Sequence, residues 1–384
     1  MGNVPNLRFP EFSGEWVTKS INDLAVVIGG GTPDTTVKSY WDGEIQWFTP
    51  SEIGKNKYVD SSLRTITEVG LNNSSAKLLP PNTILLSSRA TIGECSLSLR
   101  ECATNQGFQC LVSKKCNVDF LYYLIQTKKK DLIRKSCGST FLEISANEVR
   151  KIQVSVPSDV EQQKIAELLS LIDERIATQN KIIEDLKKLK SAIIHRCYSS
   201  QTNMIPLSEL LKQCSDRNRS GSDLQVLSVS NKYGFIAQSD QFEDREVASD
   251  DTSNYKVVKK GMFAYNPARI NVGSIALYEM DSNGIVSPMY VCFTTKSELL
   301  PSYLKYYFAS QTFKHEMYKR LEGSVRLCLT FEELCNIEIH LPSIEQQKNI
   351  SKYISKIENN LSLVDSIFSK YQQQRRYLLS QMFI

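Results

Sequence analysis

The sequence predicts an α+β fold: two globular domains, each followed by a long helix, with the two helices paired as an antiparallel coiled coil in an internal pseudo-two-fold repeat. Two observations support this prediction. "PSDVEQQKIAELLSLI" at Pro157–Ile172 returns as "PSIEQQKNISKYISKI" at Pro342–Ile357. Each copy opens a run without Gly or Pro in which apolar residues keep a heptad spacing, the pattern of a long amphipathic helix.

The repeat extends upstream when the proline of the first copy is placed on that of the second, an offset of 185 residues. "IQVSVP" then falls on "IEIHLP", two alternating strands that each end at proline. Ser145 falls on Thr330, and "GS" at 138–139 falls on "GS" at 323–324. Two copies of one layout predict two domains, as expected for a chain of 384 residues.

Downstream of the prolines, the apolar residues alternate steps of four and three, although the Glu-Gln-Gln-Lys blocks differ by one position. Ser158 and Ser343 are candidates to cap the helix starts. A long helix normally packs on its own domain, but the matching register favours packing of these two against each other. Lys190 and Arg375 interrupt both seams at the same place. The predicted seam consists of Ile165, Leu169, Ile172, Ile176, Ile183, Leu186, Ile193, Ile350, Ile354, Ile357, Leu361, Val364, Phe368, Tyr371 and Leu378.

These patterns divide the chain into four segments. A first domain (1–157) precedes a central helix (158–200), and a second domain (201–342) precedes a C-terminal helix (343–384). Each helix of about 38 residues would measure roughly 57 Å. Antiparallel pairing would place each domain at its own end of a rigid spacer.

The two globular segments resemble each other only in part. "SSRATIGECSL" (87–97) is similar to "PARINVGSIAL" (267–277), and "FLYYLI" (120–125) is similar to "YLKYYF" (303–308). The stretch "GGGTPDTTVKSYWDGEIQWFTPSEIG" (29–54) has no counterpart in the second half. One scaffold with two different surfaces is the pattern expected of two readers for two targets.

Composition excludes several classes of protein. The chain has 41% hydrophobic and 23% charged residues and a net charge of +4. It contains neither eighteen consecutive apolar residues nor the apolar core of a signal peptide, which predicts a cytoplasmic protein without a membrane partner. Ten cysteines without a Cys-x-x-Cys pair and three scattered histidines predict reduced thiols, no metal site and no cofactor.

Catalytic motifs are also missing from the sequence. No Gly-x-x-x-x-Gly-Lys-Ser/Thr loop occurs, and "VIGGGTP" (27–33) is interpreted as a flexible loop because it lacks the spacing of a phosphate-binding motif. "YNPAR" (265–269) lacks the second proline of an amino-methyltransferase block, and Pro33-Asp34 is not followed by a nuclease Asp/Glu-x-Lys. The sequence therefore predicts that the chain carries no catalytic site.

The remaining candidates are loop residues suited to double-stranded DNA. Arg can bond to guanine and Asn or Gln to adenine, while Lys, Ser and Thr suit phosphate oxygens. Arg89 and Arg269 recur at equivalent places, where bracing the turn is as good an explanation as a DNA contact, and packing is favoured for Trp41. In the first domain the candidates are Thr32, Lys38, Trp41, Arg89, Thr91, Asn105, Gln106, Ser139 and Thr140. In the second they are Arg217, Arg219, Lys232, Tyr233, Asn266, Arg269, Asn271, Ser324 and Arg326.

Two dissimilar domains, each followed by a Glu-Gln-Gln-Lys helix, resemble the specificity subunit of type I restriction–modification enzymes. The resemblance also includes "VPNLRFPEFSGEW" (4–16), "LAVVIGGGTP" (24–33), "RATIG" (89–93), "ATNQGF" (103–108) and "GST" (138–140). It covers essentially the whole chain, and the doubled helix is its specific part. The second domain lacks a recognisable "GGTP" segment, so its loops cannot be matched residue by residue.

The resemblance implies two target-recognition domains of mixed α/β structure, each reading one half of a split DNA sequence. It also implies two methyltransferase (M) subunits docked along the helices, two restriction/translocase (R) subunits recruited to that complex, and no chemistry by this subunit itself.

Three other interpretations remain open. The chain could be a coiled-coil scaffold whose end domains bind proteins or carbohydrate. It could be an unrecognised nuclease or methyltransferase acting alone. Within the family, it could be a silent or donor copy.

Overall fold

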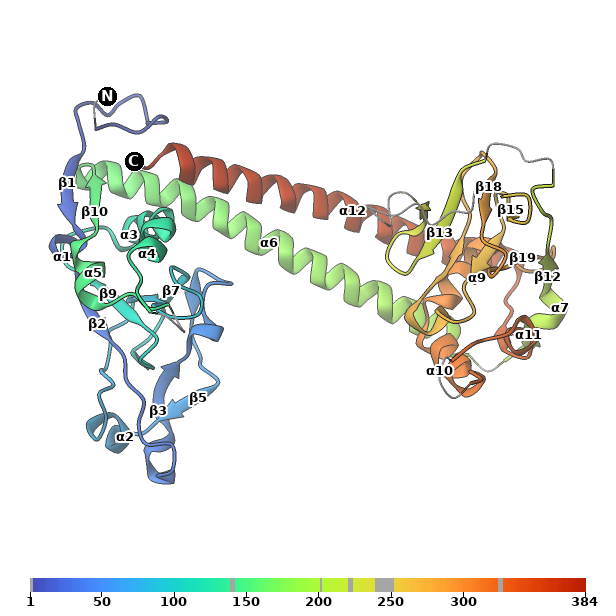
Figure 1. Cartoon of the computed structure of the whole chain (residues 1–384), viewed down its shortest axis with the longest axis horizontal. Coiled ribbons are helices and arrows are strands. Elements are labelled where there is room, and N and C mark those ends of the chain that lie inside the picture. The colour runs from blue at the N-terminus through green and yellow to red at the C-terminus, as the bar shows by residue number, and fades with distance from the viewer. Residues whose placement is uncertain (1–2, 139–141, 201, 220–223, 239–251, 324–326) are drawn as a thin grey trace. The chain divides into compact units, whose positions relative to one another are not determined.

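The computed structural model divides into two compact units, and the division passes through both long helices (Figure 1). Unit 1 comprises Met1–Asn180 and Ser366–Ile384, and unit 2 comprises Lys181–Asp365. Each unit therefore holds one half of each helix. The structure describes residues 3–138, 142–200, 202–219, 224–238, 252–323 and 327–384.

Unit 1 combines three small sheets with short helices. The sheets have the strand orders β1-β10, β2-β9-β6-β7-β4 and β5-β3-β8. The strands are β1 (Val17–Ser20), β2 (Ala25–Gly29), β3 (Trp41–Phe48), β4 (Tyr58–Val59), β5 (Arg64–Ile66), β6 (Ile84–Leu86), β7 (Cys95–Ser98), β8 (Cys102–Thr104), β9 (Gln109–Ser113) and β10 (Gln153–Val156). The short helices are α1 (Ile21–Leu24), η1 (Lys38–Tyr40), η2 (Pro50–Glu52), α2 (Glu68–Asn72), α3 (Val118–Thr127), α4 (Lys129–Arg134) and α5 (Ala146–Lys151).

Unit 2 has a similar plan. Its sheets have the orders β11-β20, β12-β19-β16-β17 and β14-β13-β18-β15. The strands are β11 (Met204–Pro206), β12 (Leu211–Cys214), β13 (Val226–Ser230), β14 (Gly234–Ala237), β15 (Lys256–Val258), β16 (Phe263–Tyr265), β17 (Ile275–Leu277), β18 (Gly284–Val286), β19 (Val291–Thr295) and β20 (Glu338–His340). The short helices are α7 (Leu207–Leu210), η3 (Ile270–Val272), α9 (Pro301–Phe308), α10 (Gln311–Lys319) and α11 (Phe331–Cys335).

Both units are of mixed α/β structure, as the resemblance implied, and several residues that the repeat aligns have the same local role. Ser145 caps α5 by accepting a hydrogen bond from the Glu148 N–H at 3.3 Å, and Thr330 caps α11 by accepting from the Glu333 N–H at 3.1 Å. The expected capping residue of α12 behaves likewise, since Ser343 accepts from the Gln346 N–H at 3.3 Å. The repeat in the sequence is thus a repeat in backbone structure.

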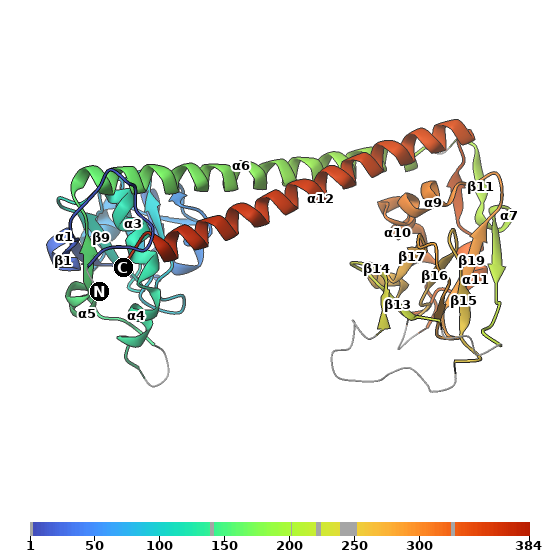
Figure 2. The ribbon, with the colours of Figure 1, turned by 90° about the horizontal axis from the view of Figure 1, so that it is seen from above.

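The long helices run antiparallel within each unit. Helix α6 spans Asp159–Tyr198 (40 residues) and α12 spans Ile344–Gln381 (38 residues). In unit 1 the beginning of α6 lies beside the end of α12, as Figure 2 shows. In unit 2 the end of α6 packs with the beginning of α12, where Ile194 and Ile354 share one core. The predicted antiparallel pair is therefore present in both units.

Every predicted seam residue is buried or half-buried. Near the domains, the helices also contribute to the domain cores: Leu169 of α6 and Leu378 of α12 pack with Phe120 of α3 in unit 1. In unit 2, Ile354 packs in the core that contains Tyr303 of α9. The helices therefore pack against their own domains as well as against each other.

All ten cysteines are free thiols. Burial raises the pKa of Cys95 and Cys110 to about 12. Within the described residues, no helix is both long and apolar enough to cross a membrane. The same residues contain no group of three or more His, Cys, Asp and Glu side chains arranged to hold a metal ion.

Candidate nucleic-acid interface and the helix junctions

Four short motifs that are distant in sequence lie side by side in unit 1. The Gly31 N–H of "GGGTP" donates to the carbonyl of Thr104 in "ATNQGF" at 2.8 Å. The Ser88 N–H, next to "RATIG", donates to the carbonyl of Gly107 at 2.8 Å, and the Ile144 N–H donates to the carbonyl of Ser88 at 3.1 Å. This last bond attaches the hairpin that follows "GST". The backbone thus assembles these motifs into one continuous set of loops.

The glycine-rich motif packs tightly, contrary to the expectation of a flexible loop. A Cβ atom on Gly30 would lie 2.0 Å from the carbonyl oxygen of Asn105, and one on Gly31 would lie 2.3 Å from the Ala76 nitrogen. Neither position leaves room for a side chain. The glycines therefore allow two loops to approach closely, which places Thr32 next to Gln106.

Two predicted DNA-binding side chains of unit 1 contact each other. The hydroxyl of Thr32 donates to the side-chain oxygen of Gln106, which is exposed. Asn105 accepts a hydrogen bond from the Gly107 N–H at 2.8 Å and so shapes the turn. Lys38 lies exposed on η1, beyond this pair. Gln106 and Lys38 are thus on the surface, whereas Asn105 is partly committed to its own loop.

Arg89 has a structural partner. Its guanidinium lies 2.8 Å from the Glu143 carboxylate, which belongs to the adjoining hairpin. The side chain is 43% exposed, so the ion pair does not remove it from the surface. Thr91 is exposed and donates its hydroxyl to Ser87 Oγ at 3.1 Å. The contact with Glu143 supports the bracing role that the sequence left open for Arg89.

Trp41 is a packing residue. It is 7% exposed, and its ring meets that of Trp47 edge-on with centroids 5.1 Å apart. The guanidinium of Arg64 lies 3.5 Å from its ring centroid, and its Nε1–H donates to the carbonyl of Asp34 at 3.1 Å. Because its face is covered, the ring is not free to stack on a base, so Trp41 is a poor candidate for DNA contact.

Unit 2 brings two of its predicted loops together. The hydroxyl of Ser274, which follows η3, donates to the carbonyl of Val229 at 2.8 Å. The Leu329 N–H donates to the carbonyl of Pro267 at 3.1 Å, which is the counterpart of the hairpin attachment in unit 1. The turn between β13 and β14, the segment around η3 and the hairpin before α11 therefore adjoin one another.

Five predicted residues of unit 2 lie on these loops, and two lie elsewhere. Arg269 and Lys232 are exposed, and Tyr233, over which Lys232 lies 4.8 Å from the ring centroid, is 67% exposed. Asn266 and Asn271 are half-buried on the segment that flanks η3. Arg217 and Arg219 are exposed on a different loop, where Arg217 donates to Asn254 Oδ1 at 2.8 Å.

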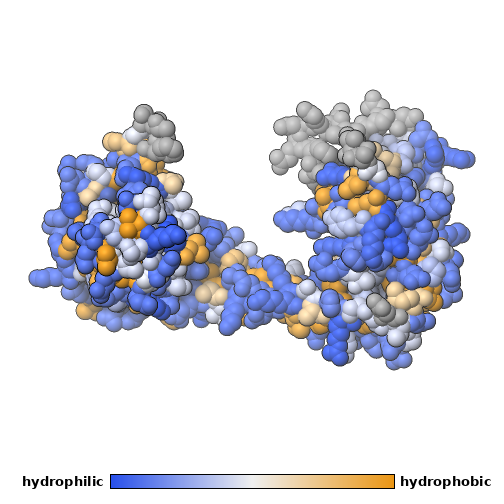
Figure 3. Space-filling model, turned by 90° about the horizontal axis from the view of Figure 1, so that it is seen from below, coloured by the Kyte–Doolittle hydropathy of each residue, from blue (hydrophilic) through white to orange (hydrophobic). Residues whose placement is uncertain are grey.

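Four predicted residues, Ser139, Thr140, Ser324 and Arg326, lie outside the described residues. The hairpins that contain them are equivalent: Cys137 pairs with Glu143 in unit 1, and Glu322 pairs with Cys328 in unit 2, at the offset of 185. A DNA contact by any of the eighteen candidates remains a prediction. On the face drawn in Figure 3, hydrophilic residues cover most of both units.

The residues that attach the long helices to the domains were not singled out from the sequence. Gln162 is 3% exposed; its side-chain oxygen accepts from the Asn117 N–H at 3.0 Å, and its Nε2 donates to the carbonyl of Pro157 at 3.0 Å. It thereby connects the beginning of α6 to the N-cap of α3.

Gln347 does the same in unit 2. It is fully buried, accepts from the N–H of Leu300, the N-cap of α9, at 2.8 Å, and donates to the carbonyl of Pro342 at 2.9 Å. Gln162 and Gln347 are 185 residues apart, so the one-position slip of the motif vanishes when the buried glutamines are aligned. A glutamine shared by two otherwise mismatched blocks was the available signal.

Curated relatives resemble parts of this chain. It is 39% identical over 180 residues to the type I restriction enzyme MjaIX specificity subunit of Methanocaldococcus jannaschii. It is 31% identical over 190 residues to the EcoR124I/EcoR124II specificity subunit of Escherichia coli. These alignments cover 46% and 47% of this chain but only 42% and 46% of the relatives. The type I restriction enzyme MjaVIII specificity subunit of M. jannaschii is 24% identical, with 93% of this chain and 88% of the relative covered.

The fold is also similar to solved structures. A crystal structure of a type I restriction–modification S subunit from M. genitalium matches with a TM-score of 0.62 and 17% identity, covering 99% of both chains. A chain from a structural study of the assembly and conformational transition of a type I restriction–modification system matches with a TM-score of 0.58 and 14% identity, covering 97% of this chain and 98% of that one. The family described as type I restriction modification DNA specificity domain matches residues 13–188 and 218–367. With both domains matched over most of its length, the chain belongs to this family.

Proposed function

We propose that this chain is the sequence-reading subunit of a type I restriction–modification complex. The observation that supports it best is the pairing of one scaffold with two different surfaces. The sheet order β2-β9-β6-β7 of unit 1 recurs as β12-β19-β16-β17 in unit 2, whereas the third sheets differ. Two readers on one scaffold suit a target in two unlike halves.

In this proposal the subunit itself is not catalytic. It binds double-stranded DNA with a split target, and the domains at 1–157 and 201–342 each read one half. Two M subunits dock on the helical part of the chain, and two R subunits join that complex. Joining two readers in one chain makes the second binding event intramolecular, which multiplies their specificity.

The decisive experiment is long-read sequencing that detects DNA methylation. DNA would come from a host expressing this chain with the methyltransferase encoded beside it, and from a host lacking only this chain. The expected result is a split motif that is methylated only when the chain is present. No modified motif, with both proteins present in soluble form, would contradict the proposal or identify an inactive copy.

Salt dependence separates DNA reading from the scaffold alternative. Phosphate contacts release counterions, so DNA affinity should fall steeply as ionic strength rises. A scaffold binding proteins or carbohydrate through neutral contacts would show little salt dependence. Exchanging residues 1–157 for those of another family member should alter one half of the methylated motif; a change in both halves would refute one domain per half-site.

A further inference from the structure

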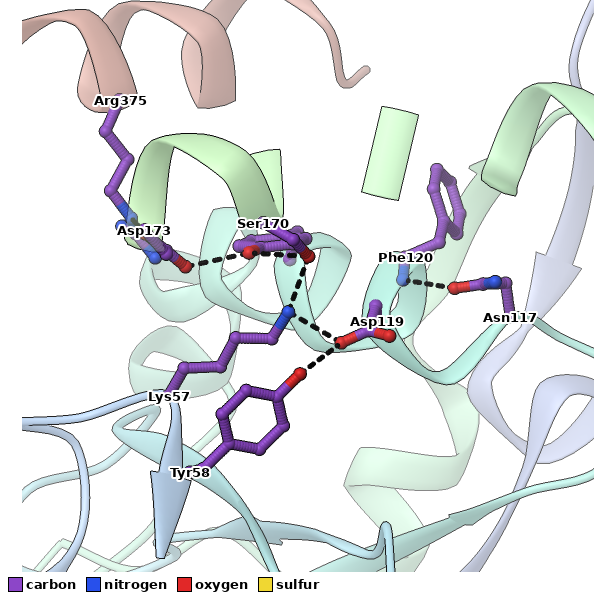
Figure 4. A network of polar contacts seen from close by, with 9 residues as sticks. Lys57, Tyr58, Asn117, Asp119, Phe120, Ser170, Asp173 and Arg375 are labelled. Carbon is purple, nitrogen blue, oxygen red and sulfur yellow. Dashed lines mark hydrogen bonds and ion pairs between the residues drawn. The ribbon is translucent and has the colours of Figure 1, made fainter. Parts of the chain in front are cut away.

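A buried polar cluster connects three helices in unit 1. Arg375 of α12 pairs with Asp173 of α6, with 2.5 Å between Nε and Oδ1. Tyr123 of α3 donates its hydroxyl to the other carboxylate oxygen of Asp173 at 2.7 Å. Ser170 of α6, one turn away, accepts a hydrogen bond from Lys57 at 2.7 Å. Figure 4 shows Arg375 reaching from α12 to Asp173 and the neighbouring Lys57 network.

Unit 2 contains the same cluster with the helices exchanged. Lys190 of α6 lies 2.6 Å from Glu358 Oε1 of α12. Tyr306 of α9 donates its hydroxyl to Glu358 Oε2 at 2.9 Å. Glu358 follows Asp173 by 185 residues, and Arg375 follows Lys190 by 185. The residues that interrupt the apolar seams in the sequence are therefore the cations of two equivalent clusters.

The environment keeps the unit 1 cluster ionised and hydrogen-bonded. Burial acts against the charge of Arg375, but the charge and hydrogen bond of Asp173 outweigh it and raise the pKa of the guanidinium. Burial, and then the charge of Asp173, raise the pKa of Tyr123, so its hydroxyl remains a donor. A charge buried this way destabilises the protein when it loses its partner.

The apolar seam alone does not define how far α6 is shifted along α12. Its Ile and Leu residues recur every seven positions, so a shift of one heptad brings apolar residues opposite apolar residues again. The polar residues are not repeated in this way. A one-heptad shift would place Ala166 or Asn180 opposite Arg375 and would place Phe368 or Met382 opposite Asp173.

We propose that the Asp173–Arg375–Tyr123 and Lys190–Glu358–Tyr306 clusters are positioning residues that select one axial register of α6 against α12. The tyrosines attach the selected register to α3 and α9, the apolar helices of the two domains. On the proposed function, the register sets the unread gap in the DNA target, because a one-heptad shift moves one helix by about 10 Å, roughly three base pairs.

A distance measurement tests the register without DNA. Bio-orthogonal spin labels would be placed at the exposed positions Glu167 and Gln374 in unit 1, and at Glu184 and Asn360 in unit 2. Pulsed electron paramagnetic resonance should give one narrow distance for each pair in the wild-type chain. With both clusters broken by Asp173→Asn and Glu358→Gln, each distribution should broaden or split. Narrow, unchanged distances in the folded double variant would overturn the proposal.

The two clusters supply their own rescue experiment. Asp173→Glu with Arg375→Lys gives unit 1 the ion pair of unit 2 and should preserve the narrow distance. If Asp173→Asn prevents folding, Arg375→Gln with Lys190→Gln removes the same pairs from the cation side. Arg376→Glu and Lys188→Glu are exposed controls of similar charge change that should leave the register unaltered. Broadening by these controls to the same degree would also count against the clusters.

Methylated motifs provide the functional measurement. The double variant should methylate the same two half-sites at more than one gap length, and the Glu–Lys exchange in unit 1 should restore a single gap. A single wild-type gap in the broken variant would refute the role in target spacing. If the wild-type chain directs no methylation, the proposed function fails, while the spin-label distances still decide the register.

Discussion

The two units share a scaffold and differ in the part built on it. In unit 1 the sheet β2-β9-β6-β7 is extended by β4, and a separate sheet has the order β5-β3-β8. In unit 2 the corresponding sheet is β12-β19-β16-β17, and the separate sheet has four strands, β14-β13-β18-β15. The shared sheet packs with the apolar helix and the long helices, whereas the separate sheets build the divergent loops. Contacts with the helices therefore restrain the shared part more strongly than the reading surface.

The helix junctions show the same contrast on a smaller scale. Buried Gln162 and Gln347 make equivalent hydrogen bonds, but the residue before each differs. Glu161 is 1% exposed and pairs with Arg8 at 2.8 Å in unit 1. At the same offset in unit 2 stands Gln346, which is exposed. The N-terminal segment thus secures one junction in a way that the other does not share.

Removing the aromatic anchor of either junction should have the largest effect. Phe120 and Tyr303 are fully buried, and they pack at centroid distances of 5.3 Å and 4.7 Å against Phe383 and Tyr198, the ends of α12 and α6. We expect Phe120→Ala and Tyr303→Ala each to lower the free energy of unfolding by about 3–5 kcal/mol. Urea denaturation followed by far-UV circular dichroism measures the loss.

Tryptophan fluorescence locates the effect, because all three tryptophans lie in unit 1. Phe120→Ala should shift the fluorescence midpoint, whereas Tyr303→Ala should affect mainly the dichroism signal. Equal fluorescence shifts for the two variants would show that the units unfold as one cooperative structure, and would remove the basis for treating them separately.

Replacing the junction glutamines should cost less. Gln162→Leu leaves the Asn117 N–H without its acceptor, and Gln347→Leu does the same to Leu300. A buried donor without a partner costs about 1–3 kcal/mol. Thermal unfolding should show similar losses for both variants. The exposed neighbour Gln163 provides the control, since Gln163→Leu should change stability little. A large loss for only one of the two glutamines would contradict their equivalence.

The sequence was sufficient for the repeat because a helix seam and a strand–proline–helix order depend on local periodicity. The antiparallel pairing, the burial of residues such as Leu169 and the equivalence of Ser145 with Thr330 follow from that periodicity. The roles of Gln162 and of the Asp173–Arg375 pair could not be predicted, because their partners lie on segments that are distant in sequence. Lys190 and Arg375 were visible only as interruptions of a pattern.

The candidate interface was predictable in composition but not in geometry. The sequence offered Arg89 and Arg269 as equals, yet Arg89 pairs with Glu143. Arg269 is exposed and forms no ion pair with any residue that the structure describes. Aromatic rings such as Trp41 are equally ambiguous, because packing and base stacking call for the same side chain. Only the cover provided by Arg64 decides between them.

This difference predicts unequal effects on DNA binding. On the proposed function, Arg269→Ala should weaken binding to the methylated target sequence about 5- to 30-fold, in the range of 1–2 kcal/mol for one lost contact. Arg89→Ala should weaken it less, because part of that side chain's charge is engaged by Glu143. Fluorescence anisotropy at several salt concentrations measures both. Equal losses would show that the Glu143 ion pair does not restrain Arg89.

The smallest expected difference between the units concerns alkaline stability. Burial raises the pKa of Cys95, Cys102, Cys110 and Cys116 in unit 1 from 9.0 to about 12, but does so only for Cys292 in unit 2. Above pH 9 the unfolded chain loses these protons while the folded chain keeps them, so stability is full below pH 9 and falls as pH rises toward 12. Each thiol contributes up to about 1.4 kcal/mol per pH unit.

Urea midpoints measured between pH 8 and 10.5 should therefore fall faster by tryptophan fluorescence, which reports unit 1, than by dichroism. Cys110→Ala should reduce this slope by one thiol's share even if the cavity it leaves lowers stability at every pH, because slope and offset have different causes. Cys137 is exposed and serves as the control, since Cys137→Ala should leave the slope unchanged. An unchanged slope for Cys110→Ala would mean that other groups cause the alkaline loss.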